Sequence, residues 1–176
     1  MADRLDVRRL GVDDAASFIA LRREALEAAP LAFAASPEDD FALAPDFVGR
    51  SLENRDEQAV FGYFEDGRLR GIVGLVRSSR WKQRHLATLW GMYVSSAARR
   101  RGAGRALIDA AVAQARAWSV DQVQLGVTDA APEAKRLYEA AGFRTWGRQP
   151  RTLQWQGRYV DESHMALDLR EPGRMR

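Results

Sequence analysis

The stretch from residue 89 to residue 127 places the strongest limit on how this chain folds. Residues 89–94 and residues 123–127 are two apolar runs of the kind that form buried strands. Between them, small and apolar residues recur at helical spacing and predict a helix with an apolar stripe: Ala103, Ala106, Leu107, Ala110, Ala113 and Ala117. A strand, a helix and a strand in this order predict a βαβ unit with a right-handed crossover.

The residues before this unit predict further elements. Residues 5–9 alternate between apolar and polar and suit a short strand, after which Asp13 or Asp14 can cap a helix that runs to about Ala29. Residues 31–45 are rich in alanine, proline and acidic residues, which predicts a loop able to act as a substrate lid. A short helix follows near residues 46–54.

A hairpin is predicted around the dipeptide Asp66-Gly67. This dipeptide separates two β-rich runs, residues 59–64 and 69–77, and is a strong signal for a tight turn. A third strand at residues 85–95 would complete an antiparallel meander.

The residues after the βαβ unit predict one more helix and two strands. Thr128 or Asp129 can cap a helix, Pro132 suits its first turn and Gly142 its end. Strands are expected at residues 143–147 and 158–169. We expect an α+β fold with helices on both faces of a mixed, mostly antiparallel sheet, built as one domain over residues 1–176 with a core from about 3 to 170.

Composition excludes several classes of function. The chain has no cysteine, which rules out disulfides, thiolate metal sites and a cysteine nucleophile. His85 and His164 lack carboxylates at a spacing that would complete a metal site, so no metal is expected. The net charge is only +3, with one concentrated basic run at residues 99–101, which disfavours nucleic acid. No signal-peptide h-region or membrane span is apparent, so we expect a cytoplasmic protein.

The loop at residues 99–104 (Arg-Arg-Arg-Gly-Ala-Gly) suits an anion better than a solvated charge cluster. Consecutive N–H groups at a helix N-terminus favour a bound phosphate, and Gly102 and Gly104 let the backbone come close. Arginine side chains can add fork-shaped hydrogen bonds. The P-loop pattern and the third small residue of the dinucleotide fingerprint are both missing, which disfavours ATP and NAD.

Two motifs resemble one known family. Arg99, Gly102 and Gly104 match the pattern [QR]xxGx[GA], and residues 137–143 (LYEAAGF) match LYExxGF. On these motifs the chain resembles the GNAT superfamily of acyl-CoA-dependent N-acetyltransferases, over about residues 5–169. The resemblance implies a GNAT-like sheet whose central strand pair is splayed, with acetyl-CoA as cosubstrate and pantetheine lying between the two strands.

The resemblance also implies residue roles. A backbone N–H between Met92 and Val94 would polarise the acetyl carbonyl, and Tyr138 would protonate or orient the departing thiolate. The implied cofactor-binding set is Met92, Tyr93, Val94, Arg99, Arg100, Arg101, Gly102, Ala103, Gly104, Arg105, Ala131, Lys135 and Tyr138.

The chain departs from the family pattern at two positions. Ala131 stands where many members have an asparagine that contacts pantetheine, and Thr88 stands where some histone-type members have a catalytic glutamate. Because a protonated amine must lose a proton before it attacks, a base is still needed. We rank Glu162 and His85 first, ahead of Glu24 and His164.

The sequence therefore predicts an enzyme that transfers acetyl to a primary amine of a small molecule or peptide by direct attack in a ternary complex. A noncatalytic acyl-CoA-binding regulatory module and a small nucleic-acid-binding protein remain alternatives. A homodimer formed through the C-terminal strands is also compatible with the sequence.

Overall fold

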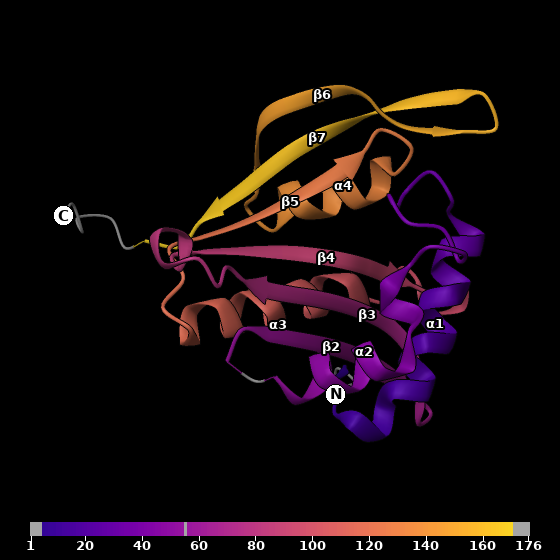
Figure 1. Ribbon diagram of the computed structural model, residues 1–176, viewed down its shortest axis with the longest axis vertical. Coiled ribbons are helices and arrows are strands. Elements are labelled where there is room, and N and C mark those ends of the chain that lie inside the picture. Colours follow the sequence, from indigo (N-terminus) through magenta and orange to yellow (C-terminus); the bar gives the residue numbers. More distant parts are fainter. Residues whose placement is uncertain (1–4, 55, 171–176) are drawn as a thin grey trace.

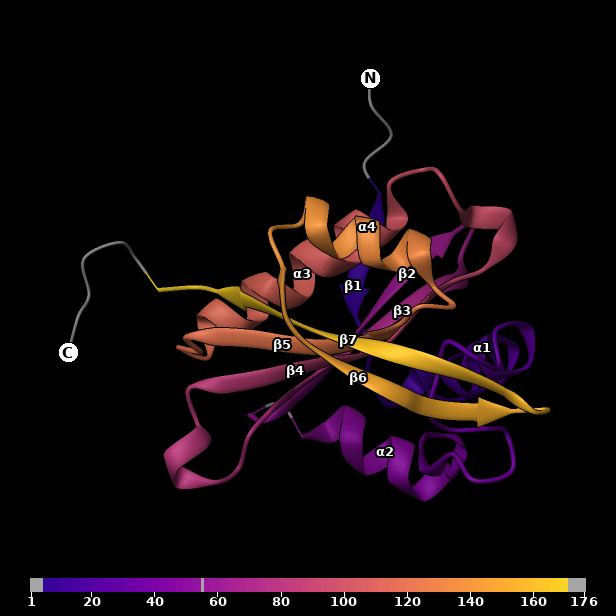
Figure 2. The ribbon, with the colours of Figure 1, turned by 90° about the horizontal axis from the view of Figure 1, so that it is seen from above.

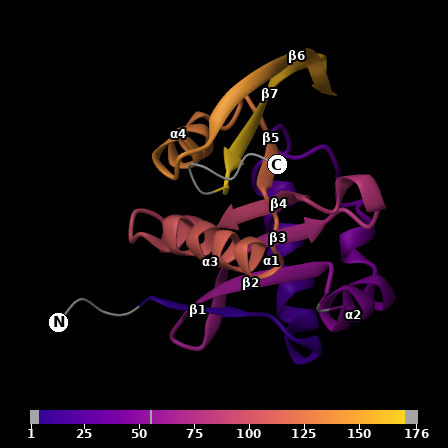
Figure 3. The ribbon, with the colours of Figure 1, turned by 90° about the vertical axis from the view of Figure 1, so that its left-hand side faces the viewer.

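A seven-stranded sheet forms the centre of the computed structural model, which describes residues 5–54 and 56–170. Its strands are β1 (Asp6–Arg9), β2 (Gln58–Glu65), β3 (Arg68–Arg77), β4 (Leu86–Val94), β5 (Gln122–Thr128), β6 (Arg144–Trp155) and β7 (Arg158–Asp168). They lie in the order β1-β2-β3-β4-β5-β7-β6, which can be followed in Figure 3. β4 and β5 pair in parallel and all other neighbours are antiparallel, which confirms the predicted meander and βαβ unit.

Four α-helices cover the two faces of the sheet (Figure 2): α1 (Ala15–Ala28), α2 (Pro45–Glu53), α3 (Ala103–Ala117) and α4 (Pro132–Ala140). α3 and α4 pack on one face, where Leu107 and Ile108 join a core with Val73 and Val123. α1 and α2 pack on the other face, where the predicted stripe of α1 (Phe18, Leu21 and Ala25) is buried. None of the helices in the described ranges is long and apolar enough to cross a membrane.

The central strands β4 and β5 separate along their length. Their pairing is confined to three positions, Leu86 with Gln122, Ala87 with Val123 and Thr88 with Gln124. Beyond Thr88 the strands diverge, as Figure 1 shows. Residues 89–94 therefore have one backbone edge paired with β3 and the other edge facing an opening in the sheet. This confirms the splayed pair.

The buried face of α3 differs from the predicted stripe. Ala113 and Ala117 are exposed, whereas Ile108, Ala111 and Ala115 are fully buried with Leu107. Alanines fill both faces of this helix, so their spacing alone does not show which face is buried. The bulkier pair Leu107 and Ile108 directs the helix onto the sheet.

The predicted cap of α4 was wrong. The helix has Ala131 at its N-cap without a side-chain hydrogen bond, and Pro132 opens the first turn as expected. The side chain of Asp129 instead binds Arg148 at 2.5 Å, and the Thr128 hydroxyl donates to the carbonyl of Leu31 at 2.7 Å. Both side chains therefore bind residues that are distant in sequence, on β6 and after α1, and neither caps the helix.

The C-terminal hairpin is longer than predicted. β6 continues to Trp155 although it contains Pro150, and its pairing with β7 shifts register at two places. Arg151 has a positive φ of 52° inside this strand. Because β6 is an edge strand with mostly exposed side chains, it lacks the alternation that reveals half-buried strands.

The segment between α1 and α2 is tied to the sheet at one place and to α1 at another. Thr128 is 3% exposed and its hydroxyl holds the carbonyl of Leu31. Further along, the Asp40 carboxylate accepts from the Arg22 side chain of α1 at 2.6 Å and caps a short 3-10 helix, Phe41–Leu43, through Ala42 N–H. The predicted lid segment thus lies against the open end of the splayed strands.

Replacing Thr128 with valine is expected to lower the free energy of unfolding by about 1 kcal/mol, because the carbonyl of Leu31 loses its donor while the side-chain volume is kept. Urea unfolding measures the change. Thr145→Val on the exposed face of β6 is the matched control. Equal stability of the two variants would show that the hydroxyl does not anchor the segment.

Candidate active site

A cleft of about 360 Å³ occupies the splay between β4 and β5. Its lining comes from both faces of the sheet. The face covered by α3 and α4 contributes Tyr138, Ala134 and Met92, and the face covered by α1 and α2 contributes Arg22 and Phe41. Between these two groups, strands β4, β5 and β7 contribute the rest of the lining described here: Thr88, Leu89, Trp90, Gly91, Gly126, Val127 and Glu162. The cleft therefore crosses the sheet.

The loop before α3 presents a row of free backbone donors. Within the described residues, the N–H groups of residues 100–105 have no protein acceptor, and the first helical bond runs from Ala106 N–H to the carbonyl of Gly102. Gly102 has a φ of 84°, a conformation that glycine adopts without the cost of a side chain. Consecutive N–H groups at the start of a 15-residue helix form a ready anion site. This backbone fits a pyrophosphate.

The four arginines of this region have different surroundings. Arg99 donates from Nε to the carbonyl of Val94 at 3.0 Å, and Arg101 forms an ion pair with Glu65 at 2.5 Å. Arg105 binds both Asp109 and the carbonyl of Ala140 on α4. In the described part of the chain, the Arg100 side chain has no such partner and is exposed. It is the arginine most available to an anion.

The two family-like motifs meet in space, although about 35 residues separate them. A side chain at Gly104 would come within 2.8 Å of Leu137 on α4 and 3.3 Å of Met92 on β4. The start of α3, α4 and the splayed strand therefore converge. Gly104 is what lets them approach so closely.

Tyr138, the second residue of the motif at residues 137–143, lies next to this convergence near the end of α4. It is 5% exposed, lines the cleft and packs edge-on against Phe143 with ring centroids 5.8 Å apart. Burial raises the pKa of Tyr138 well above its usual range, so the phenol stays protonated at neutral pH. No group in the described residues forms a hydrogen bond with its hydroxyl. The phenol is thus a buried donor without a partner in the described part of the chain.

The strand β4 contains a bulge at the cleft. Gly74 pairs with Trp90 and Ile72 with Tyr93, so Gly91 and Met92 together lie opposite Val73. Gly91 has a φ of 63°, as a bulged residue often does. The Tyr93 side chain points to the α1 side, where its hydroxyl donates to Glu24 at 3.0 Å. Burial, with Glu24 as a further cause, raises the pKa of Tyr93. Only the backbone of Tyr93 is therefore available at the splay.

Glu162 is a carboxylate that lines the cleft from β7. Its side chain lies over Gly126 of β5, in space that any side chain at position 126 would fill. Its Oε2 is 3.8 Å from Nε2 of His164, whose ring stacks on Trp146 with centroids 5.4 Å apart. A glycine inside a strand signals close approach of another group, and Gly126 was that signal in the sequence.

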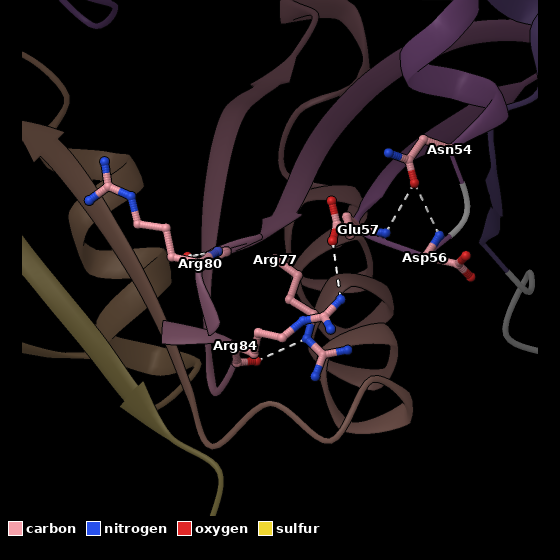
Figure 4. A network of polar contacts seen from close by, with 7 residues as sticks. Asn54, Asp56, Glu57, Arg77, Arg80 and Arg84 are labelled. Carbon is pink, nitrogen blue, oxygen red and sulfur yellow. Dashed lines mark hydrogen bonds and ion pairs between the residues drawn. The ribbon is translucent and has the colours of Figure 1, made fainter. Parts of the chain in front are cut away.

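The other candidate bases lie away from the cleft. His85 is exposed at the paired end of β4, where its carbonyl accepts from Asp121 and Gln122. It follows Arg84, which belongs to a separate polar network with Glu57 and Arg77 (Figure 4). Glu24 is exposed beside Tyr93, and His164 lies next to Glu162 without lining the cleft. Glu162 alone among the four candidates lines the cleft.

Two of three further predicted positions line the cleft. Thr88 lines the cleft at the last paired position of β4, and Ala131 lines it at the start of α4. Lys135 turns instead toward β7, where its Nζ donates to the buried hydroxyl of Ser163 at 3.1 Å. Within the described ranges, no group of three or more acidic or histidine side chains is arranged to hold a metal ion.

Sequence reasoning missed Arg22. This arginine is 6% exposed on the buried face of α1 and lines the cleft beside Asp40 and Phe33. Its position four residues after Phe18 and three before Ala25 puts a charge on an apolar stripe. That break in the stripe was the available signal.

Comparison with known proteins agrees with this geometry. A sequence profile described as "Acetyltransferase (GNAT) family" matches residues 18–143, well over half of the chain. No curated protein matches the chain.

Several solved structures share the fold. A GNAT superfamily phosphinothricin acetyltransferase from Sinorhizobium meliloti, in complex with acetyl-CoA, has a TM-score of 0.85 at 21% identity, covering 100% of this chain and 93% of that chain. A putative acetyltransferase from Salmonella typhimurium with its cofactor acetyl-CoA has a TM-score of 0.84 at 21% identity, covering 99% of each chain. A ribosomal-protein-alanine N-acetyltransferase from Brucella melitensis has a TM-score of 0.80 at 25% identity, covering 94% of this chain and 100% of that chain. The chain therefore belongs to the GNAT family of acetyltransferases, enzymes that use acetyl-CoA as acyl donor.

Proposed function

We propose that this protein transfers acetyl from acetyl-CoA to an amine by direct attack in a ternary complex. The observation that carries the proposal is the cleft through the splay. It brings a carboxylate, Glu162, and a buried protonated phenol, Tyr138, to the unpaired edge of β4. The lack of cysteine removes a thiol-linked acyl-enzyme, which favours direct attack.

The donor half of the site uses the backbone of two elements. Free N–H groups at residues 100–105 bind the pyrophosphate, with Arg100 adding charge. The unpaired edge of β4 after Thr88 offers hydrogen bonds to pantetheine. Acetyl-CoA supplies the activated acetyl thioester. An N–H of the Met92–Val94 stretch polarises its carbonyl, and a preorganised donor of this kind is worth about 3 kcal/mol in the transition state.

Two side chains handle the protons. Glu162 accepts a proton from the acceptor ammonium and leaves the amine free to attack the thioester carbonyl. As the carbon–sulfur bond breaks, Tyr138 donates its phenolic proton to the departing sulfur. The raised pKa of Tyr138 keeps that proton in place at neutral pH. The attacking nitrogen then releases its second proton, which passes through water to the Tyr138 phenolate and restores the phenol, so that the products are a neutral amide and the CoA thiol.

Calorimetry with acetyl-CoA and thiol release with a panel of amines test the proposal. We expect saturable binding of acetyl-CoA and thiol release that depends on the added amine. Binding without release for any amine would instead support a noncatalytic acyl-CoA-binding module on the same fold. No binding would remove both functions.

Arg100→Glu is expected to weaken acetyl-CoA binding at least tenfold, because a cation near the pyrophosphate becomes an anion. Calorimetry at one fixed salt concentration measures the change. Arg80→Glu is the matched control, since Arg80 is an exposed arginine in the loop between β3 and β4. A similar loss in both variants would mean that net charge, and not the loop, sets the affinity.

A further inference from the structure

Arg22 carries a hydrogen-bond donor that none of the described residues accepts from. Its guanidinium is held from one side by Asp40, whose Oδ2 is 2.6 Å from Nε. The other Asp40 oxygen accepts from Ala42 N–H, so each carboxylate oxygen has a partner and the carboxylate holds the guanidinium in place. Phe33 covers the planar face, 4.9 Å from ring centroid to the guanidinium carbon.

The Nη1 nitrogen of Arg22 is buried and has no hydrogen-bond partner in the described residues. Buried polar nitrogens in folded proteins nearly always have a partner, and an unpaired guanidinium N–H is particularly costly. Arg22 also lines the cleft. A ligand in the cleft can supply the missing acceptor.

The position of Nη1 limits what that ligand can be. It lies 3.6 Å from the point that a side-chain carbon at Gly91 would occupy, so it lies beside the bulge of β4. In the proposed function this bulge borders the reacting carbonyl. A group bound to Nη1 is therefore only a short distance from the attacking amine.

The cleft has a positive side chain on one side and a negative side chain on the other. Arg22 is on the α1 side, and Glu162 is on β7 at the splay. A guanidinium with a free edge prefers a carboxylate, and a carboxylate prefers an ammonium. This arrangement complements a zwitterion that carries one carboxylate and one ammonium.

We propose that Arg22 binds the carboxylate of the acetyl acceptor and that the acceptor is a free α-amino acid. The inference rests on the proposed function and adds the acceptor class to it. Asp40 and Phe33 act as positioning residues that hold the guanidinium toward the cleft.

Matched sets of amines test this inference on the native enzyme. Each set consists of an amino acid, its carboxamide and its decarboxylated amine, with several side chains represented. We expect kcat/KM, measured by thiol release, to be about 10- to 100-fold higher for the acid than for its amide, as for loss of a hydrogen bond to a charged group. Equal kcat/KM within each set, or a preference for amides or peptide N-termini, would overturn the inference and leave acetyl transfer intact.

Binding provides a readout that does not depend on turnover. We expect the complex of the protein with CoA to bind the acid at least tenfold more tightly than the amide in calorimetry. If no acid of the panel binds, the inference is wrong. If acetyl-CoA itself fails to bind, the proposed function fails first, so the two failures are distinguishable.

A paired substitution tests the assignment to Arg22. Arg22→Gln combined with Asp40→Asn removes both charges of the buried pair and leaves no uncompensated charge behind. The acid-to-amide ratio of kcat/KM should fall toward one in this variant. Arg23→Gln, an exposed neighbour on the same helix, should keep the native ratio. If the double variant keeps the native acid-to-amide ratio of kcat/KM and an unchanged melting temperature, Arg22 does not bind the acceptor.

Discussion

Replacing Glu162 with glutamine is expected to lower kcat by about 10²- to 10⁴-fold at neutral pH, the range that positioned general bases contribute. Glutamine fills the same space beside Gly126 but cannot accept the proton of the acceptor ammonium. As the pH rises toward about 10, more of the amine is already free, so the deficit should narrow. Thiol release at saturating acetyl-CoA over this pH range measures both effects.

Two variants test whether the effect belongs to the position of the Glu162 carboxylate. Gly126→Ala places a carbon where that carboxylate now lies, so it should also lower kcat although the carboxylate is kept. Glu133→Gln, in the exposed first turn of α4, should have no effect on the rate. A Glu162→Gln enzyme with native kcat at neutral pH would show that the proton leaves by another route.

Tyr138→Phe is expected to lower kcat by about 10²-fold or more and to leave the Kd for acetyl-CoA within about twofold. The ring and its packing on Phe143 are kept, and only the proton donor is lost. Because burial raises the pKa of this phenol, it stays protonated past its usual range, and the native rate should not fall at alkaline pH through its ionisation. A stopped-flow or steady-state thiol assay and calorimetry give the two quantities.

Tyr159→Phe is the matched control for Tyr138→Phe, because Tyr159 is an exposed tyrosine on β7. It should be indistinguishable from the native enzyme in both assays. If Tyr138→Phe has a native rate, Tyr138 is a packing residue and has no part in thiolate departure.

The sequence predicted the fold where short-range patterns decide it. A positive φ occurs in the turn at Gly67, in the loop at Gly102 and at Gly142, where α4 ends. All three glycines can be recognised in the sequence. The splay followed from resemblance and is confirmed by the three-residue pairing of β4 with β5. The face of α3 and the length of β6 could not be predicted, because alanine fits either face and an exposed edge strand has no apolar alternation.

The proposed donor half of the site can be read from the sequence, whereas the proposed acceptor half cannot. The loop proposed to bind the cofactor is contiguous in sequence, so one motif is enough to suggest it. Glu162 and Arg22 reach the cleft only through long-range pairing, of β7 with β5 and of α1 with residue Asp40. Without that pairing, Glu162 and His85 are equally plausible polar residues near strands. Residues brought together only by tertiary structure show no local pattern in the sequence that reveals their proximity.

An opening that crosses the sheet has consequences for inhibition kinetics. The loop proposed to bind the pyrophosphate leads into α3, on the side of α3 and α4, and Arg22 lies on the side of α1 and α2. We expect each side of the sheet to provide its own mouth, so that the two substrates enter and leave in either order. A compound that blocks only the mouth beside Arg22 should therefore lower the maximal rate without competing with acetyl-CoA, and a compound that blocks only the other mouth should compete with acetyl-CoA and not with the amine.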